Sequence, residues 1–437
     1  MLHVNDPAVR KRLLQGNFGL ERENLRVDSK GYLAQTDHPF AGHKHIERDF
    51  CENQVEINTP VVHSAAEAVE LLAGYDRLIQ ETLGNLPERE YLWPFSNPPY
   101  IRSEEDIPIA RFTGDQASKR EYRDYLSDRY GRYKMTFSGI HFNYSFSEEL
   151  LEADFAASGE TDFDLYKNRL YLELAERAAA YGWLMVAVTA ASPLMDSSFV
   201  EKGKFDQDTF HGMASVRCSE LGYWNFFASV LDYSSIEAYA DSIKRYVDQG
   251  LLRAPSELYY PIRLKPRGKN LLSTLREKGV DHIELRMFDL NPLAPFGIEE
   301  RDVQFAQMFL IWLASTSREP FTVQNQVQAV QNFKNAAHYD LKTVKIILPN
   351  GEIDSVADAA LKVIDRMKKF YADFPEEIRQ VLRFQEEKFL DAENRYAWKL
   401  RKAYANGYVK KGLVLARKKQ EESIASGSSR WNEKKAQ

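Results

Sequence analysis

Two glutamates stand one residue apart near the N-terminus, in the stretch FGLERENLRV at residues 18–27. The segment is prone to form a β-strand, in which side chains alternate between two faces, so Glu21 and Glu23 should point to the same side. Two like charges so close repel each other unless a positive charge lies between them. The pair therefore indicates either a divalent metal that needs further ligands or the solvated edge of a strand.

A second acidic run follows in ERDFCENQVEINTP, residues 47–60. Asp49, Glu52 and Glu56 recur at spacings of three and four, so they would share one face of a helix, and a loop followed by a strand could still bring them to one site. Crowded carboxylates need a neutralising charge, and Mg²⁺ or Mn²⁺ takes oxygen ligands from Asp and Glu. The HKHIE segment at 43–47 has metal-binding residue types but lacks the spacing of a zinc motif, so we do not expect zinc there.

A histidine is placed for similar chemistry in the strand predicted at 134–146. His141, Asn143 and Ser145 share one face, while alternating aromatic residues of the same strand point to the core. The histidine face is neither fully apolar nor plainly solvated, as expected for the wall of a ligand cavity. A single histidine is also often a hydrogen-bonded structural residue, and this alternative stays open.

The strand predicted at 281–290 repeats the arrangement, with His282, Glu284 and Arg286 on one face. The carboxylate and the guanidinium could simply pair in water, which is a weak interaction. Alternatively, Glu284 holds a metal while Arg286 binds a phosphate with its planar guanidinium. Three separate segments thus each offer carboxylates or a histidine on one predicted face, and together they favour a metal-dependent site.

Composition limits the classes of function. The chain has 437 residues, of which 44% are hydrophobic and 28% charged, which suits about two to three domain-sized units or one large domain. The net charge of -6 and the lack of a long basic tract mean that nucleic acid is not an expected partner. No GxxxxGK[ST], HExxH or GxSxG motif occurs, so a nucleotide would have to be held by metals and cationic side chains.

Cysteine usage and the apolar segments favour a cytoplasmic protein. Cys51 and Cys218 are too few for a disulfide framework and too scattered for a thiolate zinc site, so a reducing compartment is expected. The N-terminus, MLHVNDPAVRKRLL, lacks the apolar core of a signal peptide. The most apolar run, at 182–195, is too short and too interrupted to span a bilayer, so no membrane partner is expected.

Hydrophobic periodicity predicts the elements that must position these residues. Residues 1–60 are predicted to form strands and turns, before the two later strands already described. Helices are predicted at 64–86, with Ser64 as N-cap, and at 119–132, 162–191, 234–252 and 297–316. Residues 351–419 are predicted to form charged amphipathic helices, and 426–437 a disordered tail. Strands and helices that do not alternate regularly favour the α+β class.

Six ordered motifs resemble those of glutamate–cysteine ligase, also called γ-glutamylcysteine synthetase. The resemblance is to the bacterial type and is closest to the first part of bifunctional glutathione synthetases. It runs from about residue 15 to 315 and more loosely to the end of the chain. The motifs are GLERENLRV, DFCENQVEINTP, RYGRYKMTFSGIHFNYS, SVRCSELGY, ELYYPIR and IELRMFDLNP.

The resemblance implies a fold, an activity and an organisation of the chain. The fold would be a glutamine-synthetase-like curved antiparallel sheet that forms a funnel-shaped active site, with helices packed outside. The enzyme would use ATP and Mg²⁺, with Mn²⁺ as the alternative metal, to join the glutamate γ-carboxylate to the cysteine amine through a γ-glutamyl phosphate, the first step of glutathione synthesis. Residues 1–350 would be the catalytic ligase domain and 351–419 a C-terminal helical extension of it. The oligomeric state stays open, with a monomer favoured.

The same resemblance implies roles for individual residues. Arg217 and Arg286 would take part in catalysis, and Arg286 would also contact the triphosphate. The implied metal ligands are Glu21, Glu23, Asp49, Glu56, His141 and Glu284. The implied substrate pocket is formed by Arg217, Tyr223 and Tyr259, with Tyr122, Leu126 and Phe137 around the acceptor side chain.

Two departures from the family pattern leave alternatives open. Bifunctional relatives continue into an ATP-grasp domain, and this chain is shorter, so we expect it to make the dipeptide and not glutathione. Phe137 stands where some relatives carry a smaller aliphatic residue, so a γ-glutamyl ligase for another amine is the nearest alternative. A catalytically dead binding relative is disfavoured because all six implied ligands are present. A metal-dependent hydrolase would need neither ATP nor an arginine-lined phosphate site.

Overall fold

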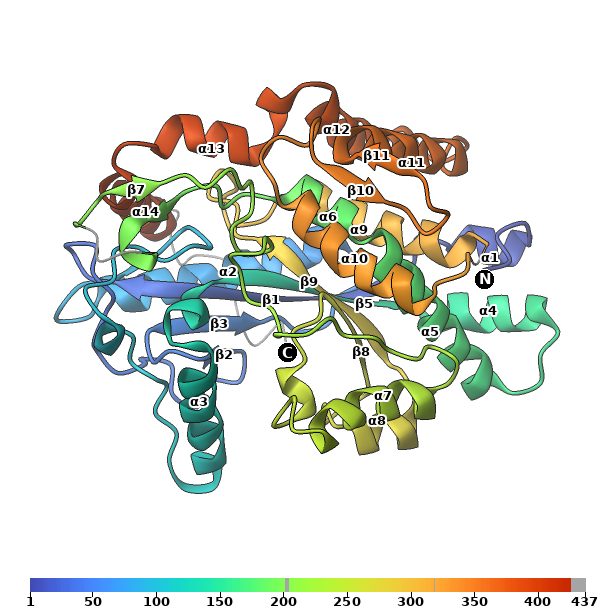
Figure 1. Ribbon diagram of the computed structural model, residues 1–437, viewed down its shortest axis with the longest axis horizontal. Coiled ribbons are helices and arrows are strands. Elements are labelled where there is room, and N and C mark those ends of the chain that lie inside the picture. Colours follow the sequence, from blue (N-terminus) through green and yellow to red (C-terminus); the bar gives the residue numbers. More distant parts are fainter. Residues whose placement is uncertain (201–203, 318, 426–437) are drawn as a thin grey trace.

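Seven strands in the described part of the chain form one antiparallel sheet at the centre of the fold (Figure 1). The computed structural model describes residues 1–200, 204–317 and 319–425, so the tail predicted at 426–437 lies outside the described residues. Six strands follow the order β2–β3–β1–β5–β9–β8, and β4 pairs with the C-terminal end of β1. Their bounds are β1 Gly16–Val27, β2 Ile46–Arg48, β3 Gln54–Asn58, β4 Tyr91–Leu92, β5 Gly139–Phe146, β8 Ile262–Lys265 and β9 His282–Asp289.

Among the described residues, helices and two small hairpin sheets surround this sheet. The small sheets pair β6 (Met195–Asp196) with β7 (Asp208–Thr209), and β10 (Lys345–Ile347) with β11 (Ile353–Ser355). The mixture of an antiparallel sheet and separate helices confirms the α+β class. The helices are α1 Pro7–Arg12, α2 Ala65–Gly84, α3 Ala117–Tyr130, α4 Glu148–Ser158, α5 Phe163–Tyr181, α6 Trp183–Thr189, α7 Ile236–Asp248, α8 Leu272–Lys278, α9 Glu300–Ser315, α10 Val323–Ala336, α11 Val356–Phe370, α12 Glu376–Leu390, α13 Tyr396–Tyr404 and α14 Tyr408–Ala425.

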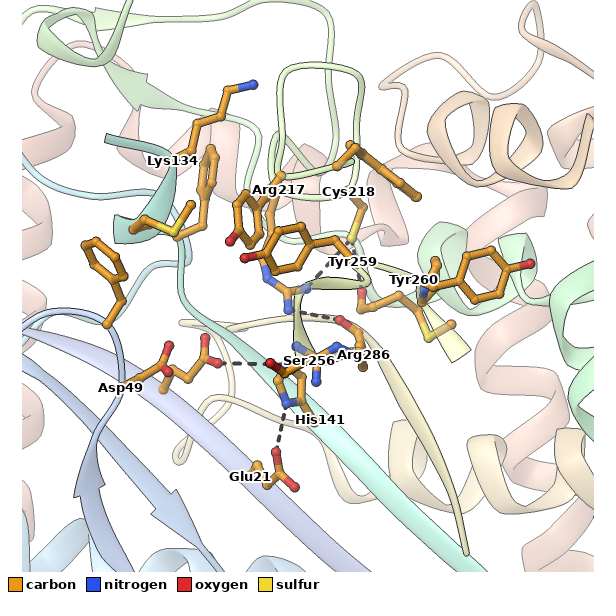
Figure 2. Close-up of a pocket in the computed structure, with 18 of the residues that line it drawn as sticks. Glu21, Asp49, Lys134, His141, Arg217, Cys218, Ser256, Tyr259, Tyr260 and Arg286 are labelled. Carbon is orange, nitrogen blue, oxygen red and sulfur yellow. Dashed lines mark hydrogen bonds and ion pairs between the residues drawn. The ribbon is translucent and has the colours of Figure 1, made fainter. Parts of the chain in front are cut away.

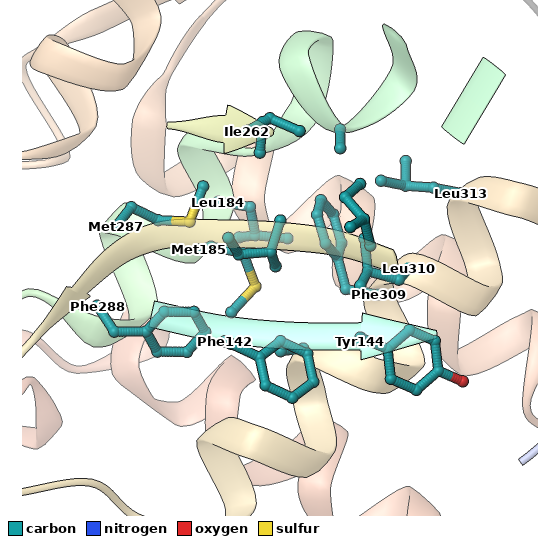
Figure 3. Packing of buried hydrophobic residues seen from close by; sticks show 14 of the residues in the cluster. Phe142, Tyr144, Leu184, Met185, Ile262, Met287, Phe288, Phe309, Leu310 and Leu313 are labelled. Carbon is teal, nitrogen blue, oxygen red and sulfur yellow. The ribbon is translucent and has the colours of Figure 1, made fainter. Parts of the chain in front are cut away.

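Alternation along the central strands separates an apolar face from a polar one. The ring of Phe18 on β1 lies 6.0 Å from that of Phe142 and 5.4 Å from that of Tyr144, both on β5. Figure 3 shows Phe142 and Tyr144 in the same buried cluster as Phe309 of α9. Burial of such rings away from water is the main stabilising contribution to the fold. The odd-numbered residues at 19–23 of β1 and at 139–145 of β5 therefore face the other way, where Glu21, Glu23 and His141 lie.

Two of the predicted helices illustrate what the sequence could and could not define. Ser64 caps α2 by accepting a hydrogen bond from Glu67 N, as predicted, and the helix ends at Gly84. The single helix predicted at 162–191 is instead divided into α5 and α6 at Gly182. A Cβ atom there would lie 2.7 Å from the Phe333 ring of α10, so the chain bends where another helix approaches closely.

The strand predicted at 134–146 is shorter than expected. Residues 133–136 form a 3₁₀ turn in which Thr136 Oγ1 donates to Tyr133 O at 2.5 Å, and β5 begins only at Gly139. The shorter strand does not alter which residues of β5 face the polar side. The acidic run at 47–60 contains a loop followed by β3, in agreement with the second of the two arrangements predicted for it.

The C-terminal helices pack against the body that carries the sheet. α11 and α12 contact α9, and α14 contacts α2 and β4. The buried Lys388 of α12 lies 3.0 Å from Asp302 of α9, which ties the two helices together through an ion pair. Among the described residues, no helix combines the length and the apolar character needed to cross a membrane.

Candidate active site

The central strand β1 supplies the acidic side chains of the site because it lies between β3 and β5. In the observed register, Glu21 is opposite His141 on β5, and Glu23 is opposite Glu56 on β3. Cross-strand partners stand side by side on one face of a sheet, so all four side chains project to the same side. Arg22 points to the other face, where its guanidinium is buried and pairs with a carboxylate of α2.

Glu21, His141 and Glu284 form the one group of three possible metal ligands found in the described residues, with one ligand atom from each lying within 4.8 Å of the others. His141 Nδ1 lies 2.9 Å from Glu21 Oε2 and 3.8 Å from Glu284 Oε1. Asn143 Nδ2 donates to Glu21 Oε1 at 2.9 Å. Figure 2 shows Glu21 and His141 pointing toward each other across neighbouring strands. The sheet therefore holds these three side chains together in advance of any ligand.

Charges around this group keep the two carboxylates ionised. Burial tends to raise the pKa of Glu284, but Arg286 Nη1 at 3.0 Å and Lys265 Nζ at 3.3 Å hold that pKa well below its ordinary value. Burial also opposes ionisation of Glu21, but the hydrogen bond with His141 leaves its pKa below the ordinary value. Burial and then the charge of Arg286 lower the pKa of His141. Two carboxylates and a neutral imidazole are the forms that bind metals.

Three further carboxylates crowd the same face. Burial, followed by the charge of Asp49, raises the pKa of Glu23 to about 8. The same two causes, in the same order, raise the pKa of Glu56 well above its ordinary value. Glu23 Oε2 accepts a hydrogen bond from Gly139 N at 3.1 Å, which fixes one of its oxygens. A positive charge among these groups would relieve the repulsion that favours their neutral forms.

The residues present fit a divalent cation. Among the described residues, Glu284 Oε2 is buried and has no hydrogen-bond partner, which is costly for a charged oxygen unless a ligand meets it. A set of carboxylate oxygens with a single imidazole nitrogen suits Mg²⁺ or Mn²⁺, whereas zinc sites are often rich in thiolates. The assignment of individual ligands remains a prediction.

One cavity of about 320 Å³ gathers the residues singled out in the sequence. Figure 2 shows part of its lining, which comes from the sheet, from α3 and from the loops around 217 and 259. The predicted site residues that line the cavity are Glu21, Glu23, Asp49, Glu56, Tyr122, Leu126, Phe137, His141, Arg217, Tyr223, Tyr259, Glu284 and Arg286. Residues far apart in the sequence therefore meet in one hollow.

Arg217 and an aromatic pair form the wall opposite the carboxylates. Arg217 Nη2 donates to Arg286 O at 2.9 Å, and Nη1 donates to Phe288 O at 3.3 Å, so the guanidinium is anchored on β9. The ring centroids of Tyr223 and Tyr259 lie 3.7 Å apart. An anchored cation and two phenols can bind a carboxylate while the carboxylate-rich floor binds a cation.

Not every acidic residue of the candidate run belongs to this site. Glu52 accepts hydrogen bonds from His38 N at 3.0 Å and Arg111 N at 2.6 Å, and it pairs with Arg48 at 2.8 Å. These contacts with nearby loops give Glu52 a structural role away from the cavity. Spacing of three and four did not group it with Asp49 because the segment is not a helix.

Lys265 is a cavity residue that the sequence analysis missed. It lies on the short strand β8, where Arg263 is opposite Glu284 and Lys265 is opposite His282. The pattern IRLK at 262–265, two apolar residues alternating with two cations, was a usable signal for a strand with one basic face. Four residues were too few to distinguish this strand from a loop beside Pro261.

A second cavity of about 590 Å³ lies beside the first. Glu21 lines both cavities. Lys167 and Arg267 contribute positive charge to the second cavity, and Asn143 and His282 contribute polar groups. The Glu21–His141–Glu284 group therefore lies near the junction of the first, aromatic cavity and the second one, whose lining also includes the acidic residues Glu148 and Asp281.

Comparisons with known proteins identify relatives along nearly the whole chain. The family model of glutamate–cysteine ligase matches residues 1–336. A bifunctional glutathione biosynthesis protein of Listeria monocytogenes is 37% identical over 440 residues, covering 96% of this chain and 56% of that protein. One from Clostridium perfringens is 32% identical over 378 residues, covering 83% of this chain and 48% of that protein. The chain thus spans about half the length of these curated relatives.

Solved structures agree with these matches. A glutamate–cysteine ligase of Francisella tularensis, crystallised in complex with AMP, superposes with a TM-score of 0.83 at 25% identity, covering 94% of this chain and 89% of that chain. A bifunctional glutathione synthetase of Pasteurella multocida gives a TM-score of 0.83 at 25% identity, covering 96% of this chain and 54% of that chain. Family match, sequence relatives and fold point the same way: the chain belongs to the glutamate–cysteine ligase family.

Proposed function

We propose that this chain joins the γ-carboxylate of glutamate to the amine of cysteine, converts ATP to ADP and phosphate, and releases γ-glutamylcysteine. Membership of the glutamate–cysteine ligase family supports the reaction class. The observation that carries the proposal is the single cavity that combines the Glu21–His141–Glu284 group with Arg286 and an aromatic wall. Such a site suits a reaction between anionic substrates and a nucleotide.

The reaction explains why cations must surround the carboxylates. A carboxylate does not react with an amine at neutral pH, because its carbon is a poor electrophile and its oxygen a poor leaving group. Transfer of a phosphoryl group from ATP makes a γ-glutamyl phosphate, which the amine can attack. Phosphoryl transfer depends mainly on positioning and on neutralising charge on oxygen atoms. Bound Mg²⁺ would supply that neutralisation.

The chain's own groups would hold the substrates in line. Glu21, His141 and Glu284 would hold a cation at the junction of the two cavities, and Glu23, Asp49 and Glu56 would hold further ones. Arg286 and Lys265, both near Glu284, would contact phosphate oxygens. Arg217, anchored on the backbone of β9, would bind a substrate carboxylate. Exclusion of water by the aromatic wall would protect the acyl phosphate from hydrolysis.

We propose that the amino acids bind in the aromatic cavity and the nucleotide in the second cavity. Lys167 and Arg267 offer positive charge for phosphates, and the second cavity meets the first at Glu21. The AMP complex of the Francisella tularensis relative supports nucleotide binding in this family. Replacing Lys167 and Arg267 together by methionine should raise the KM for ATP at least about tenfold, with a smaller effect on the KM for glutamate.

The proposal also specifies which amine accepts the glutamyl group. Tyr122, Leu126 and Phe137 would surround a small apolar or thiol side chain, and cysteine is such an acceptor. Relatives named for glutathione biosynthesis support cysteine. A γ-glutamyl ligase for another small amine is the alternative, because an apolar pocket discriminates weakly between side chains that differ by one methylene.

Two architectural points belong to the same proposal. Residues 1–350 would form the catalytic domain and 351–419 an extension of it, which the contacts of α11 and α12 with α9 support. The glutamine-synthetase-like funnel would be the curved sheet with the cavity at its narrow end. The acidic side chains on one face of the sheet would line this funnel.

Phosphate release from ATP tests the function directly. The purified chain with ATP, Mg²⁺ and glutamate should release phosphate slowly, and cysteine should accelerate release and yield γ-glutamylcysteine, identified by mass. EDTA should stop the reaction and added Mg²⁺ should restore it. Acceleration by an alkylamine but not by cysteine would establish the alternative acceptor, and turnover of ATP without glutamate would contradict a ligase.

A further inference from the structure

Glu257 is a buried carboxylate next to the aromatic cavity that does not line it. It ends a single 3₁₀ turn, Pro255–Glu257, and its side chain is fully buried. Two residues later comes Tyr259, and one residue earlier Ser256, both of which line the cavity. A buried charge is retained only where several partners compensate its desolvation, so its contacts show what it holds together.

One oxygen of the Glu257 carboxylate contacts donors from α3, and the other accepts a hydrogen bond from its own segment. Tyr130 Oη donates to Glu257 Oε1 at 2.8 Å and Tyr125 Oη at 3.2 Å. Arg129 Nε lies 3.2 Å from the same oxygen. Glu257 Oε2 accepts from Arg253 N at 2.6 Å. The last turns of α3 are thus fastened to the segment 251–260 through one side chain.

The same residue fastens a third segment, the loop 217–227. Asn225 Nδ2 donates to Glu257 O at 2.9 Å and lies 3.3 Å from Tyr130 Oη. Asn225 Oδ1 accepts from Tyr259 N at 2.8 Å. The ring of Tyr130 in turn lies 5.7 Å from that of Tyr223 and 5.5 Å from that of Tyr259. The two tyrosines of the cavity wall are therefore backed by the Glu257–Tyr130 pair.

α3 depends on such contacts because it buries little surface of its own. Figure 1 shows it projecting from the body at the lower left of the molecule. Of its fourteen residues, all within the described part of the chain, Leu126 and Tyr130 are the buried ones. Tyr122 reaches the segment 251–260 through Ser256 Oγ at 3.2 Å. Polar contacts, rather than a broad apolar face, fix where α3 presents Tyr122 and Leu126 to the cavity.

We propose that Glu257 is a positioning residue that sets the shape of the acceptor side of the cavity. Its side chain would hold α3, and through Tyr130 the loop 217–227, against the segment 251–260. These three segments carry Tyr122, Leu126, Tyr223 and Tyr259. The floor of the cavity, built by the sheet, does not depend on these contacts. This inference rests on the proposed function, and it locates discrimination of the amine in a residue that never touches it.

Kinetics with each substrate varied in turn test the inference. E257A should raise the KM for cysteine at least about tenfold, the size expected for losing hydrogen bonds to a charged group, while the KM values for glutamate and ATP change less than about twofold. Y130F, which removes the hydroxyl bonded to Glu257 and Asn225 but leaves the other donors to Glu257, is the milder change and should raise the KM for cysteine by a smaller factor. Equal changes in all three KM values, or no change in either variant, would overturn the inference.

A matched variant separates positioning from loss of stability. Asp302 is a comparably buried carboxylate, bonded to Tyr396 Oη at 2.8 Å and Lys388 Nζ at 3.0 Å, and it lies outside both cavities. D302N should lower the melting temperature without changing the KM for cysteine selectively. A selective rise in D302N as large as in E257A would show that any destabilisation produces the effect, and would overturn the inference.

Hydrogen exchange provides a readout that needs no activity. Amides of α3 should exchange faster in E257A than in the wild type, and those of β1 and β5 should not. Unchanged exchange in α3 would show that Glu257 does not hold it. If the wild-type chain fails to release phosphate with glutamate and cysteine, the proposed function fails, and the exchange experiment still decides whether Glu257 fastens α3.

Discussion

The guanidinium of Arg217 occupies the space that a side chain at position 139 would need. A Cβ atom built on Gly139 would lie 2.3 Å from Arg217 Cζ, far inside contact distance. Gly139 begins β5 and donates its N–H to Glu23 Oε2 at 3.1 Å. One glycine thus allows a cation from a loop to lie directly above the carboxylate floor of the cavity.

Substituting this glycine should impair the enzyme without unfolding it. In G139A the methyl group would displace Arg217 from its backbone acceptors, and kcat/KM for ligation should fall roughly tenfold to a hundredfold. Steady-state phosphate release measures the effect. G84A is the control, because its added Cβ would meet the flexible end of Ile424 at 3.1 Å, far from the cavity. Wild-type activity in G139A would mean that the position of Arg217 is unimportant.

The charge of Glu21 should be essential while its shape is not. E21Q keeps the size of the side chain but removes a negative ligand, so ligation should fall at least about a hundredfold, more than changes outside the ligand shell usually cause. The melting temperature should change little, because glutamine keeps the size of the side chain and can still form hydrogen bonds with His141 and Asn143. E70Q, on the exposed face of α2, should behave like the wild type in both assays. Normal turnover by E21Q would refute a metal role for this face.

Local pattern was enough to predict which side chains share a strand face. Glu21 and Glu23 point together because a strand has a period of two, and the aromatic residues of β5 are buried for the same reason. The register that sets Glu21 opposite His141 joins residues 120 positions apart, and no local signal encodes it. The family resemblance implied that Glu21 and His141 lie in one site, and the pairing of β1 with β5 places them opposite each other.

The features that the sequence did not predict depend on tertiary contacts. The break at Gly182 exists because Phe333 of another helix packs there, which periodicity cannot reveal. Lys265 was missed because β8 is only four residues long. Glu257 lies inside the motif ELYYPIR, and its burial depends on tyrosines of α3 more than 120 positions earlier, which no local pattern reveals.

The size of Phe137 should influence which amine is accepted. Its ring lies 4.9 Å from that of Phe199 and in a small buried cluster with Met195, Met213 and Val216 at the edge of the cavity. In F137L the cavity should gain space, so kcat/KM for 2-aminopentanoate relative to 2-aminobutyrate should rise about tenfold, the usual value of one methylene in a pocket. Competition between the two amines, with products separated by mass, measures the ratio. An unchanged ratio would place the acceptor side chain elsewhere.

Because Lys388 is buried, the free energy of unfolding should depend on pH in the alkaline range. Burial lowers the pKa of Lys388 to about 8 from an ordinary value of 10.5, despite the nearby Asp302. Between these pH values the unfolded chain binds more protons than the folded chain, so the free energy of unfolding gains a contribution that increases with pH.

Comparison with K388M isolates this contribution from other titrating groups. Between pH 7.5 and pH 10 the wild type should gain on the order of 2 kcal/mol relative to K388M, and most of the gain should come above pH 8. Urea unfolding at several pH values measures the difference. Lys419, whose pKa burial also lowers to about 8, is present in both proteins and cancels. Parallel curves for the two proteins would show that Lys388 stays charged in the fold, with Asp302 compensating its burial fully.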